Sequence, residues 1–214
     1  MMVGDRGAAR AVSRTGTLAV EGGPGLNVTN SWTVRGLAGL VSRLVVSPEL
    51  RARDIGSLTG RLSNGPGHPA VDVLVQGNVE VMVSENCVVG TVLGCDAGDC
   101  GPGGESAAFF GLRDSKRRVF PLSVDGECRT HLRNSVDLCL LDHVVMIAGM
   151  GVDGMVIDAR WKGPAYAREV TALYREALDL CTSTDGPAAE DLERLKEGVR
   201  RRALGGITTG PFLC

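Results

Sequence analysis

The sequence is poor in aromatic residues, which make up 4% of its 214 positions, so its core must rest on valine, leucine, isoleucine and methionine. It also has no excess of one charge, because 23 lysines and arginines stand against 25 aspartates and glutamates. A net charge of -2 provides no global field that would draw the chain to nucleic acid or to an anionic membrane. Any basic surface must be local, as at 113–118 and 200–202.

Long apolar segments are missing as well. No run reaches the ~18 residues that cross a bilayer. Residues 1–16 are small, basic and polar, without the apolar stretch of a signal peptide. We therefore expect a cytoplasmic protein that has no membrane partner, in a compartment where thiols stay reduced.

Cysteine, in contrast, is concentrated in one part of the chain. Five of the 7 cysteines lie there: Cys87, Cys95, Cys100, Cys128 and Cys139. Reduced thiols at this density are more typical of a metal or cluster site than of disulfides. Four thiolates suit tetrahedral zinc and an iron–sulfur cluster equally well, so the residues alone leave both open. A glycine-rich loop with incidental cysteines is a third interpretation of 87–100.

The rest of the chain alternates short apolar runs with amphipathic segments, which indicates parallel βα units. The main strands are predicted at 26–30, 43–47, 71–76 and 154–158, with extra strands at 79–83 and 119–122. Helices are predicted at 33–41, 49–60, 138–150, 164–180 and 188–202. Residues 1–22 have no clear period and are expected to form a flexible lead-in.

Four βα units are half of the eight that close a barrel of ~250 residues. The sequence therefore predicts an α/β fold in the form of a partial TIM-type (β/α) barrel. Its half-barrel domain would span 23–212, with a Cys-rich insertion at 78–134 between the third and fourth main strands. Open sheet edges pair with other chains when uncovered, so we expect a complementary half-barrel chain or a homo-oligomer.

Polar residues follow the ends of the predicted strands, at the face where barrels of this class build their sites. The candidates for a substrate pocket are Asn27, Glu49, Gln76, Asp158 and Arg160. The alternative for the last two is an ion pair that braces the rim.

His131 lies three residues after Cys128 and is a further candidate, as a substrate contact or as a hydrogen-bond donor to a metal ligand. A structural histidine is an equal alternative. A peptidase needs a positioned nucleophile with its base, or a metal-bound water. The sequence has neither Gly-x-Ser-x-Gly nor His-Glu-x-x-His, and no nucleophile and base stand out as a pair.

Five motifs in order carry a family resemblance: QGNVEVMVS at 76–84, FPL at 120–122, NSVDL at 134–138, GVDGMVIDAR at 151–160 and GITTG at 206–210. Together with the cysteines they resemble the peptidase U32 family, the collagenase-like proteins, over residues 24–212. The resemblance implies a TIM-type barrel of which this chain is the C-terminal half.

Several members of that family carry a four-cysteine iron–sulfur cluster and act in hydroxylation of RNA bases or of a quinone precursor. The resemblance thus implies a 4Fe-4S enzyme that acts on RNA or on a small aromatic substrate, with zinc as the alternative metal. The implied ligands are Cys87, Cys95, Cys100 and Cys128, with Cys139 in reserve. Two other functions stay open: collagenase-like proteolysis, and a non-catalytic half-barrel subunit that needs a partner chain.

Overall fold

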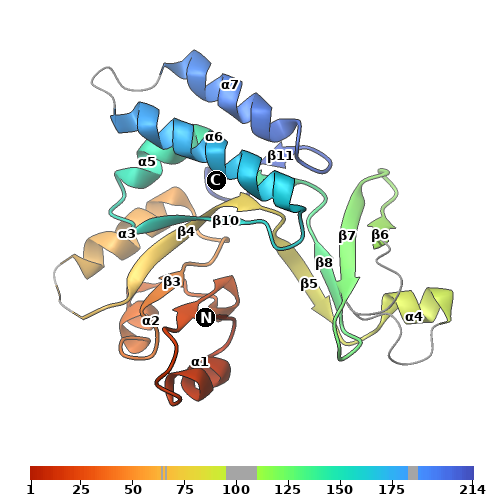
Figure 1. Ribbon diagram of the computed structural model, residues 1–214, viewed down its shortest axis with the longest axis horizontal. Coiled ribbons are helices and arrows are strands. Elements are labelled where there is room, and N and C mark those ends of the chain that lie inside the picture. The colour runs from red at the N-terminus through yellow and green to blue at the C-terminus, as the bar shows by residue number, and fades with distance from the viewer. Residues whose placement is uncertain (64, 66, 95–109, 183–187) are drawn as a thin grey trace. The chain divides into compact units, whose positions relative to one another are not determined.

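The computed structural model describes residues 1–63, 65, 67–94, 110–182 and 188–214 (Figure 1). The chain divides into two compact units. The first contains Met1–Gly77, Leu138–Val199 and Thr209–Cys214, and the second contains Asn78–Asp137 and Arg200–Thr208.

The first unit is built on a parallel sheet. Its parallel strands, in spatial order, are β1 (Met2–Val3), β2 (Glu21–Gly22), β3 (Arg43–Val45), β4 (Ala70–Gly77) and β10 (Gly154–Asp158). A short strand, β9 (Asp137–Cys139), runs antiparallel to the end of β4. Since β10 occupies one edge of β4 over this stretch, β3 and β9 share the other edge.

Helices connect and cover these strands. They are α1 (Arg6–Ser13), α2 (Ser31–Gly36), α3 (Ala52–Leu62), α5 (Val144–Ala148), α6 (Pro164–Thr182) and α7 (Ala189–Arg200), with 3₁₀ turns η1 (Pro24–Leu26) and η2 (Leu141–His143). Asp5 caps α1 by accepting a hydrogen bond from the Ala8 amide at 2.8 Å. Asn30 caps α2 in the same way, at 2.9 Å from the Thr33 amide. The predicted α/β class is confirmed, whereas no closed barrel is found among the described residues and the TIM-type barrel is not confirmed.

The core of the first unit surrounds β4. Apart from Ala70, every residue of this strand is buried, as expected for a strand that is covered on both faces. Helices supply most of the remaining apolar contacts through Ile55, Leu58, Val170, Ala177, Leu195 and Val199.

One polar cluster lies inside this core, beneath α6. The Tyr174 hydroxyl lies 2.8 Å from the Val75 carbonyl oxygen and 3.2 Å from Gln76 Oε1, and it accepts from the Leu140 amide at 3.1 Å. Gln76 Nε2 donates to the Tyr166 hydroxyl at 2.8 Å. These bonds satisfy polar groups that would otherwise be buried without partners.

Three parts of the first unit differ from the sequence-based expectations. Residues 1–22 form β1, α1 and β2, with Val3 and Ala9 buried. The strand predicted at 26–30 is wrong, because η1 ends there and Val28 makes only an isolated bridge to Val46. The helix predicted at 138–150 is wrong at its start, where β9 and η2 precede α5.

The second unit is a four-stranded antiparallel sheet. Its strands, in spatial order, are β5 (Glu80–Ser84), β8 (Thr130–Arg133), β7 (Val119–Val124) and β6 (Phe110–Arg113). The unit also contains α4 (Val88–Leu93) and β11 (Ile207–Thr208). Residues 95–109 of the predicted insertion at 78–134 lie outside the described residues.

No helix in the described part of the chain is both long and apolar enough to cross a membrane.

Replacing Tyr174 with phenylalanine should lower the free energy of unfolding by about 1–3 kcal/mol, because buried Gln76 Oε1 then loses its donor. Urea denaturation measures the change. Adding Gln76→Leu should cost less than the sum of the two single changes, because the double variant removes both members of the Tyr174–Gln76 bond and leaves neither unsatisfied. Additivity within ~0.5 kcal/mol would contradict a stabilising bond between these two side chains.

Candidate functional site

The cysteine-bearing end of the antiparallel sheet is the best-defined candidate site. Strands β5 and β8 pair with Ser84 opposite Thr130. Cys87 follows β5 and Cys128 precedes β8, so the register brings both cysteines to the same end of this strand pair. Both residues are half-buried.

Thr130 ties the Cys87 segment to β8. Its hydroxyl donates to the Asn86 carbonyl oxygen at 2.8 Å and accepts from the Val88 amide at 3.0 Å. These two bonds flank Cys87, and the Thr130 side chain is itself buried. Sequence reasoning missed this residue, because only the register of two strands far apart in the chain reveals its position.

The two described cysteines have distinct local geometry. Cys87 is the N-cap of α4, and its Sγ atom accepts a hydrogen bond from the Gly90 amide at 3.2 Å. Cys128 adopts the left-handed conformation, with φ 61°, in the turn between β7 and β8. Cys95 and Cys100 lie outside the described residues. Among those described, no three histidine, cysteine or acidic side chains gather as metal ligands would.

Cys139, the reserve ligand, lies in the core of the first unit. Its side chain is buried, and its Sγ atom lies 3.9 Å from the Tyr174 hydroxyl. Burial raises the pKa of the Cys139 thiol, which keeps it protonated. A neutral, enclosed thiol fits a packing role.

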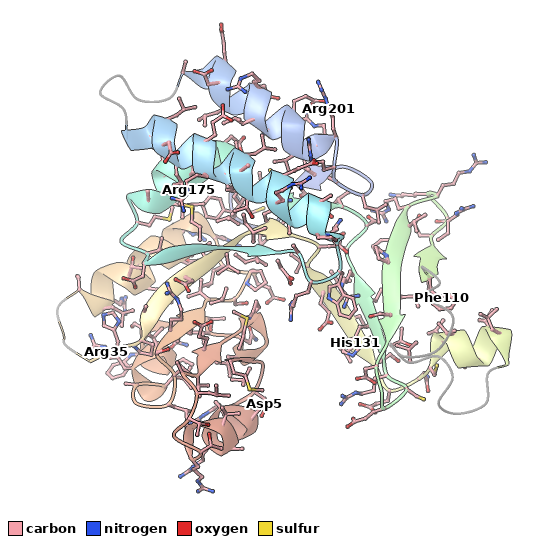
Figure 2. The ribbon with its side chains drawn as sticks, in the orientation of Figure 1. Asp5, Arg35, Phe110, His131, Arg175 and Arg201 are labelled. Carbon is pink, nitrogen blue, oxygen red and sulfur yellow. The ribbon has the colours of Figure 1, made fainter. Side chains whose placement is uncertain are left out.

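His131, labelled in Figure 2, lies on β8, and its two ring nitrogens face two carboxylates. Its Nδ1 atom is 2.8 Å from Glu80 Oε2, and its Nε2 atom is 3.1 Å from Asp125 Oδ2. Arg129 also pairs with Asp125, at 2.8 Å, and the buried Arg133 lies 4.0 Å from Glu80. Both ring nitrogens thus face acceptors, an arrangement that favours a charged imidazolium over a general base.

The electrostatics of this cluster follow from its contacts. Burial lowers the pKa of His131, but the hydrogen bonds to Asp125 and Glu80 outweigh it, and the net shift is upward. The His131 hydrogen bond and the Arg129 contacts lower the pKa of Asp125. A His131 ring held between two carboxylates fits a structural role in the sheet.

The predicted substrate pocket in the first unit is only partly assembled. Asp158 and Arg160 form a two-pronged ion pair, with Nε to Oδ1 at 2.9 Å and Nη2 to Oδ2 at 2.6 Å. Gly77 lets β4 approach β10 there, since a Cβ atom at Gly77 would lie 2.7 Å from the Asp158 carbonyl oxygen. Arg160 keeps 67% of its side chain exposed.

The other predicted pocket residues do not join this pair. Gln76 is buried against Tyr166 of α6. Asn27 and Glu49 are exposed, and no hydrogen bond or ion pair within the described ranges links either to Asp158 or Arg160.

A further charged cluster in the first unit escaped the sequence analysis. Lys196 of α7 donates to Asp142 Oδ2 at 2.6 Å. Asp142 Oδ1 lies 3.5 Å from His143 Nε2, and the His143 ring lies 5.7 Å from the Phe212 ring. The contacts join η2 to α7 and to the C-terminal segment, which indicates a structural role.

The described residues therefore form an α/β protein with a second, antiparallel unit. Two cysteine-bearing turns of that second unit lie at the same end of β5 and β8. Residues 1–213 match the model of peptidase family U32. The chain therefore belongs to peptidase family U32.

Two curated relatives are similar to this chain. The tRNA hydroxylation protein P2 of Bacillus subtilis (strain 168) is 39% identical over 69 residues, which are 32% of this chain and 21% of that protein. The uncharacterized protease MJ0090 of Methanocaldococcus jannaschii is 24% identical over 223 aligned positions, 98% of this chain and 50% of that protein. The chain thus spans half or less of the length of these relatives. No solved structure matches it significantly.

His131 should make stability depend on pH. Its folded pKa lies above the ordinary value of 6.5, so its contribution is fully present below that pH and is lost as the pH rises through the folded value. Asp125, whose pKa is lowered from 3.8, contributes above that pH and loses its contribution as the pH falls through its folded value.

Urea midpoints of wild type and His131→Gln, measured from about pH 5 to about pH 9, test this dependence. The stability advantage of wild type should shrink as the pH rises. His68→Gln is the control, because its Nδ1 atom contacts the Pro69 carbonyl oxygen rather than a carboxylate. An advantage that stays constant with pH would show that His131 is not charged in the fold.

Proposed function

We propose that this chain belongs to an iron–sulfur-dependent enzyme that modifies RNA by hydroxylation. The observation that carries the proposal is the 39% identity over 69 residues with a protein named for tRNA hydroxylation. The parallel strands and intervening helices support placing the first unit in a partial TIM-type barrel, with Asp158 and Arg160 at its rim.

The proposed cluster ligands are the four cysteines of the second unit: Cys87, Cys95, Cys100 and Cys128. Four thiolates are the usual ligand set of a 4Fe-4S cluster. The fit is supported by the shared end of β5 and β8, which brings the Cys87 and Cys128 segments together through Thr130. A cluster bound there would supply electron transfer, whereas zinc would supply structure alone.

In the first unit, the chain's own residues would bind the substrate. Asp158 fixes the Arg160 guanidinium through two hydrogen bonds, while most of the Arg160 side chain stays exposed. A planar guanidinium held in this way suits stacking against a base of the RNA, which leaves its bonds to Asp158 in place.

Metal analysis after anaerobic purification tests the cofactor. Wild type should contain iron and acid-labile sulfide and absorb visible light. Cys87→Ala, Cys95→Ala, Cys100→Ala and Cys128→Ala should each lose most of the iron. Cys139→Ala and Cys181→Ala are matched controls that should keep it, since Cys139 is enclosed and Cys181 Sγ donates to its own helix.

Thr130 provides a sharper version of this test. Thr130→Val should lower the iron content although it removes no ligand, because it breaks both bonds that flank Cys87. Thr130→Ser should restore it. Zinc without sulfide would support the alternative metal, and a protein with neither metal would contradict the proposal.

Activity is tested on tRNA from cells that lack this gene. In an extract of those cells, which supplies the oxygen donor and the oxidant, the purified protein should add one oxygen atom to a nucleoside, detected by mass spectrometry, and Arg160→Gln should weaken this reaction. Cleavage of peptides without any change in the RNA would favour proteolysis instead.

Proteolysis is the second candidate function, and the name of the Methanocaldococcus relative favours it. Among the described residues, the contacts of the three histidines argue against proteolysis, because none of them is with a nucleophile. His131 contacts two carboxylates and His68 a backbone carbonyl, while His143 lies beside Asp142. In the described part of the chain, no serine or cysteine is hydrogen-bonded to a histidine as a nucleophile would be.

We also infer that the parallel sheet takes a partner. Within the described residues, β1 pairs only with β2, and β10 pairs only with β4. Unpaired strand edges are templates for another chain. A complementary half-barrel chain would make this chain a subunit, and a second copy would make it a homo-oligomer.

Light scattering of the purified chain should therefore give a mass above the 22.4 kDa of one copy. Dilution should shift the mass downward, because strand pairing between copies depends on concentration. A monomer at all concentrations that also captures no chain encoded beside its gene would contradict an open sheet edge.

A further inference from the structure

A groove between α1 and α2 combines an exposed aromatic ring with arginines. Two adjoining hollows, of about 350 Å³ and about 720 Å³, share Arg6 and Gly36 in their lining. Leu26, Trp32 and Leu37 also line the smaller hollow, and Arg10 lines the larger one. We call this the α1–α2 groove. Both helices, which are labelled in Figure 1, belong to the first unit.

Trp32 is exposed far beyond what packing requires. The residue is 79% exposed and lies at the start of α2. Over the described residues, no cation or aromatic ring packs against its indole. A tryptophan is normally buried over most of its surface, so such exposure indicates a binding contact.

The cations of the groove are also without acidic partners. Arg6 and Arg10 lie one helical turn apart on α1, so they share a face. Neither forms an ion pair with any described residue, and no acidic side chain lines either hollow. Asp5, labelled in Figure 2, directs its carboxylate to the Ala8 amide as a helix cap.

We propose that the α1–α2 groove binds a single-stranded segment of RNA, with a base stacked on Trp32 and phosphates at Arg6 and Arg10. Aromatic rings that stack bases beside cations that contact the backbone form the usual platform for single strands. Leu26 and Leu37 give the smaller hollow an apolar floor that suits the face of a base. This inference rests on the proposed action on RNA and adds the surface that would hold the strand.

Fluorescence anisotropy with a labelled oligouridine of about 12 nucleotides tests the groove in the full chain. Trp32→Ala should weaken binding roughly tenfold, and Trp32→Phe should retain most of the affinity. In a Trp161→Phe background Trp32 is the only remaining tryptophan, since the chain has 2, and its fluorescence should be quenched as the RNA binds.

The arginines are tested by salt dependence. Each of Arg6→Gln and Arg10→Gln should reduce the slope of log affinity against log salt by about 0.7, as expected for one lost contact to a single strand. Arg53→Gln is the control, because Arg53 is an exposed arginine on α3 that lines neither hollow. The Arg53→Gln variant should show the same slope of log affinity against log salt as wild type. Binding of inorganic polyphosphate, which has phosphates but no bases, reports the contribution of charge alone. Trp32→Ala should leave the affinity for polyphosphate unchanged.

Three outcomes would overturn the inference. The first is wild-type affinity for RNA in Trp32→Ala and in both arginine variants. The second is the absence of RNA binding by wild type at low salt. The third is a lower mass of Trp32→Ala in light scattering with unchanged RNA affinity, which would assign the groove to a chain–chain contact. Iron and sulfide content are measured separately, so a failure here is distinguishable from a failure of the proposed cofactor.

Discussion

Strand β4 and the polar cluster at its carboxyl end determine the arrangement of the first unit. The Val75 carbonyl oxygen accepts from the Leu140 amide at 2.9 Å, and the Tyr174 hydroxyl lies 2.8 Å from it. The same hydroxyl reaches Gln76 and accepts from the Leu140 amide at 3.1 Å, so one side chain of α6 joins β4 to the residue that follows β9. Because a buried amide is costly when unpaired, Gln76 and Tyr174 fix the position of α6 on the sheet. The position of α6 in turn constrains β10, the strand that precedes it, and with it the Asp158–Arg160 pair.

The second unit depends on register and charge more than on an apolar core. Its sheet leaves Met82 and Leu112 about half exposed, whereas His131 and its carboxylates form a dense ionic cluster. The β5–β8 register has a separate consequence for chemistry, because it determines which two cysteine-bearing turns lie at the same end of the sheet. A shift of one residue would reverse the face of every side chain on β5 and remove Thr130 from Cys87.

The sequence predicts well where one periodic signal dominates. β10 has the predicted bounds, Gly154–Asp158, and α6 begins at Pro164 as predicted, because each is a clean apolar or amphipathic run. It fails where local and tertiary preferences compete. The apolar run from Leu138 to Leu141 is read equally well as strand or helix, and only its pairing with β4 makes its first part a strand. Asn27 adopts the left-handed conformation, with φ 47°, and so ends the strand predicted around it.

The candidate sites show the same division. Asp158 and Arg160, two residues apart, could be paired from the sequence. Glu80 and His131 are 51 residues apart, and a bulge in β5 intervenes, so their contact follows only from the fold. The position of Gln76 at a strand end could likewise be predicted from the sequence. Its contacts with Tyr166 and Tyr174 of α6 could not, because they depend on how α6 packs on the sheet.

Charge pairing explains how a chain of net charge -2 can still offer a surface to an anion. Several arginines are already neutralised by carboxylates: Arg43 by Asp72 at 2.6 Å, Arg129 by Asp125 at 2.8 Å and Arg194 by Glu176 at 2.7 Å. A phosphate would have to displace these carboxylates and would gain little. Affinity for a polyanion depends on the cations that release counterions, not on the sum over the chain. The arginines of α1 are of that kind, because Asp5 is occupied as a cap and the groove contains no acid. A net charge of -2 therefore excludes attraction of a polyanion to the chain as a whole, but it does not exclude attraction to the arginines of α1.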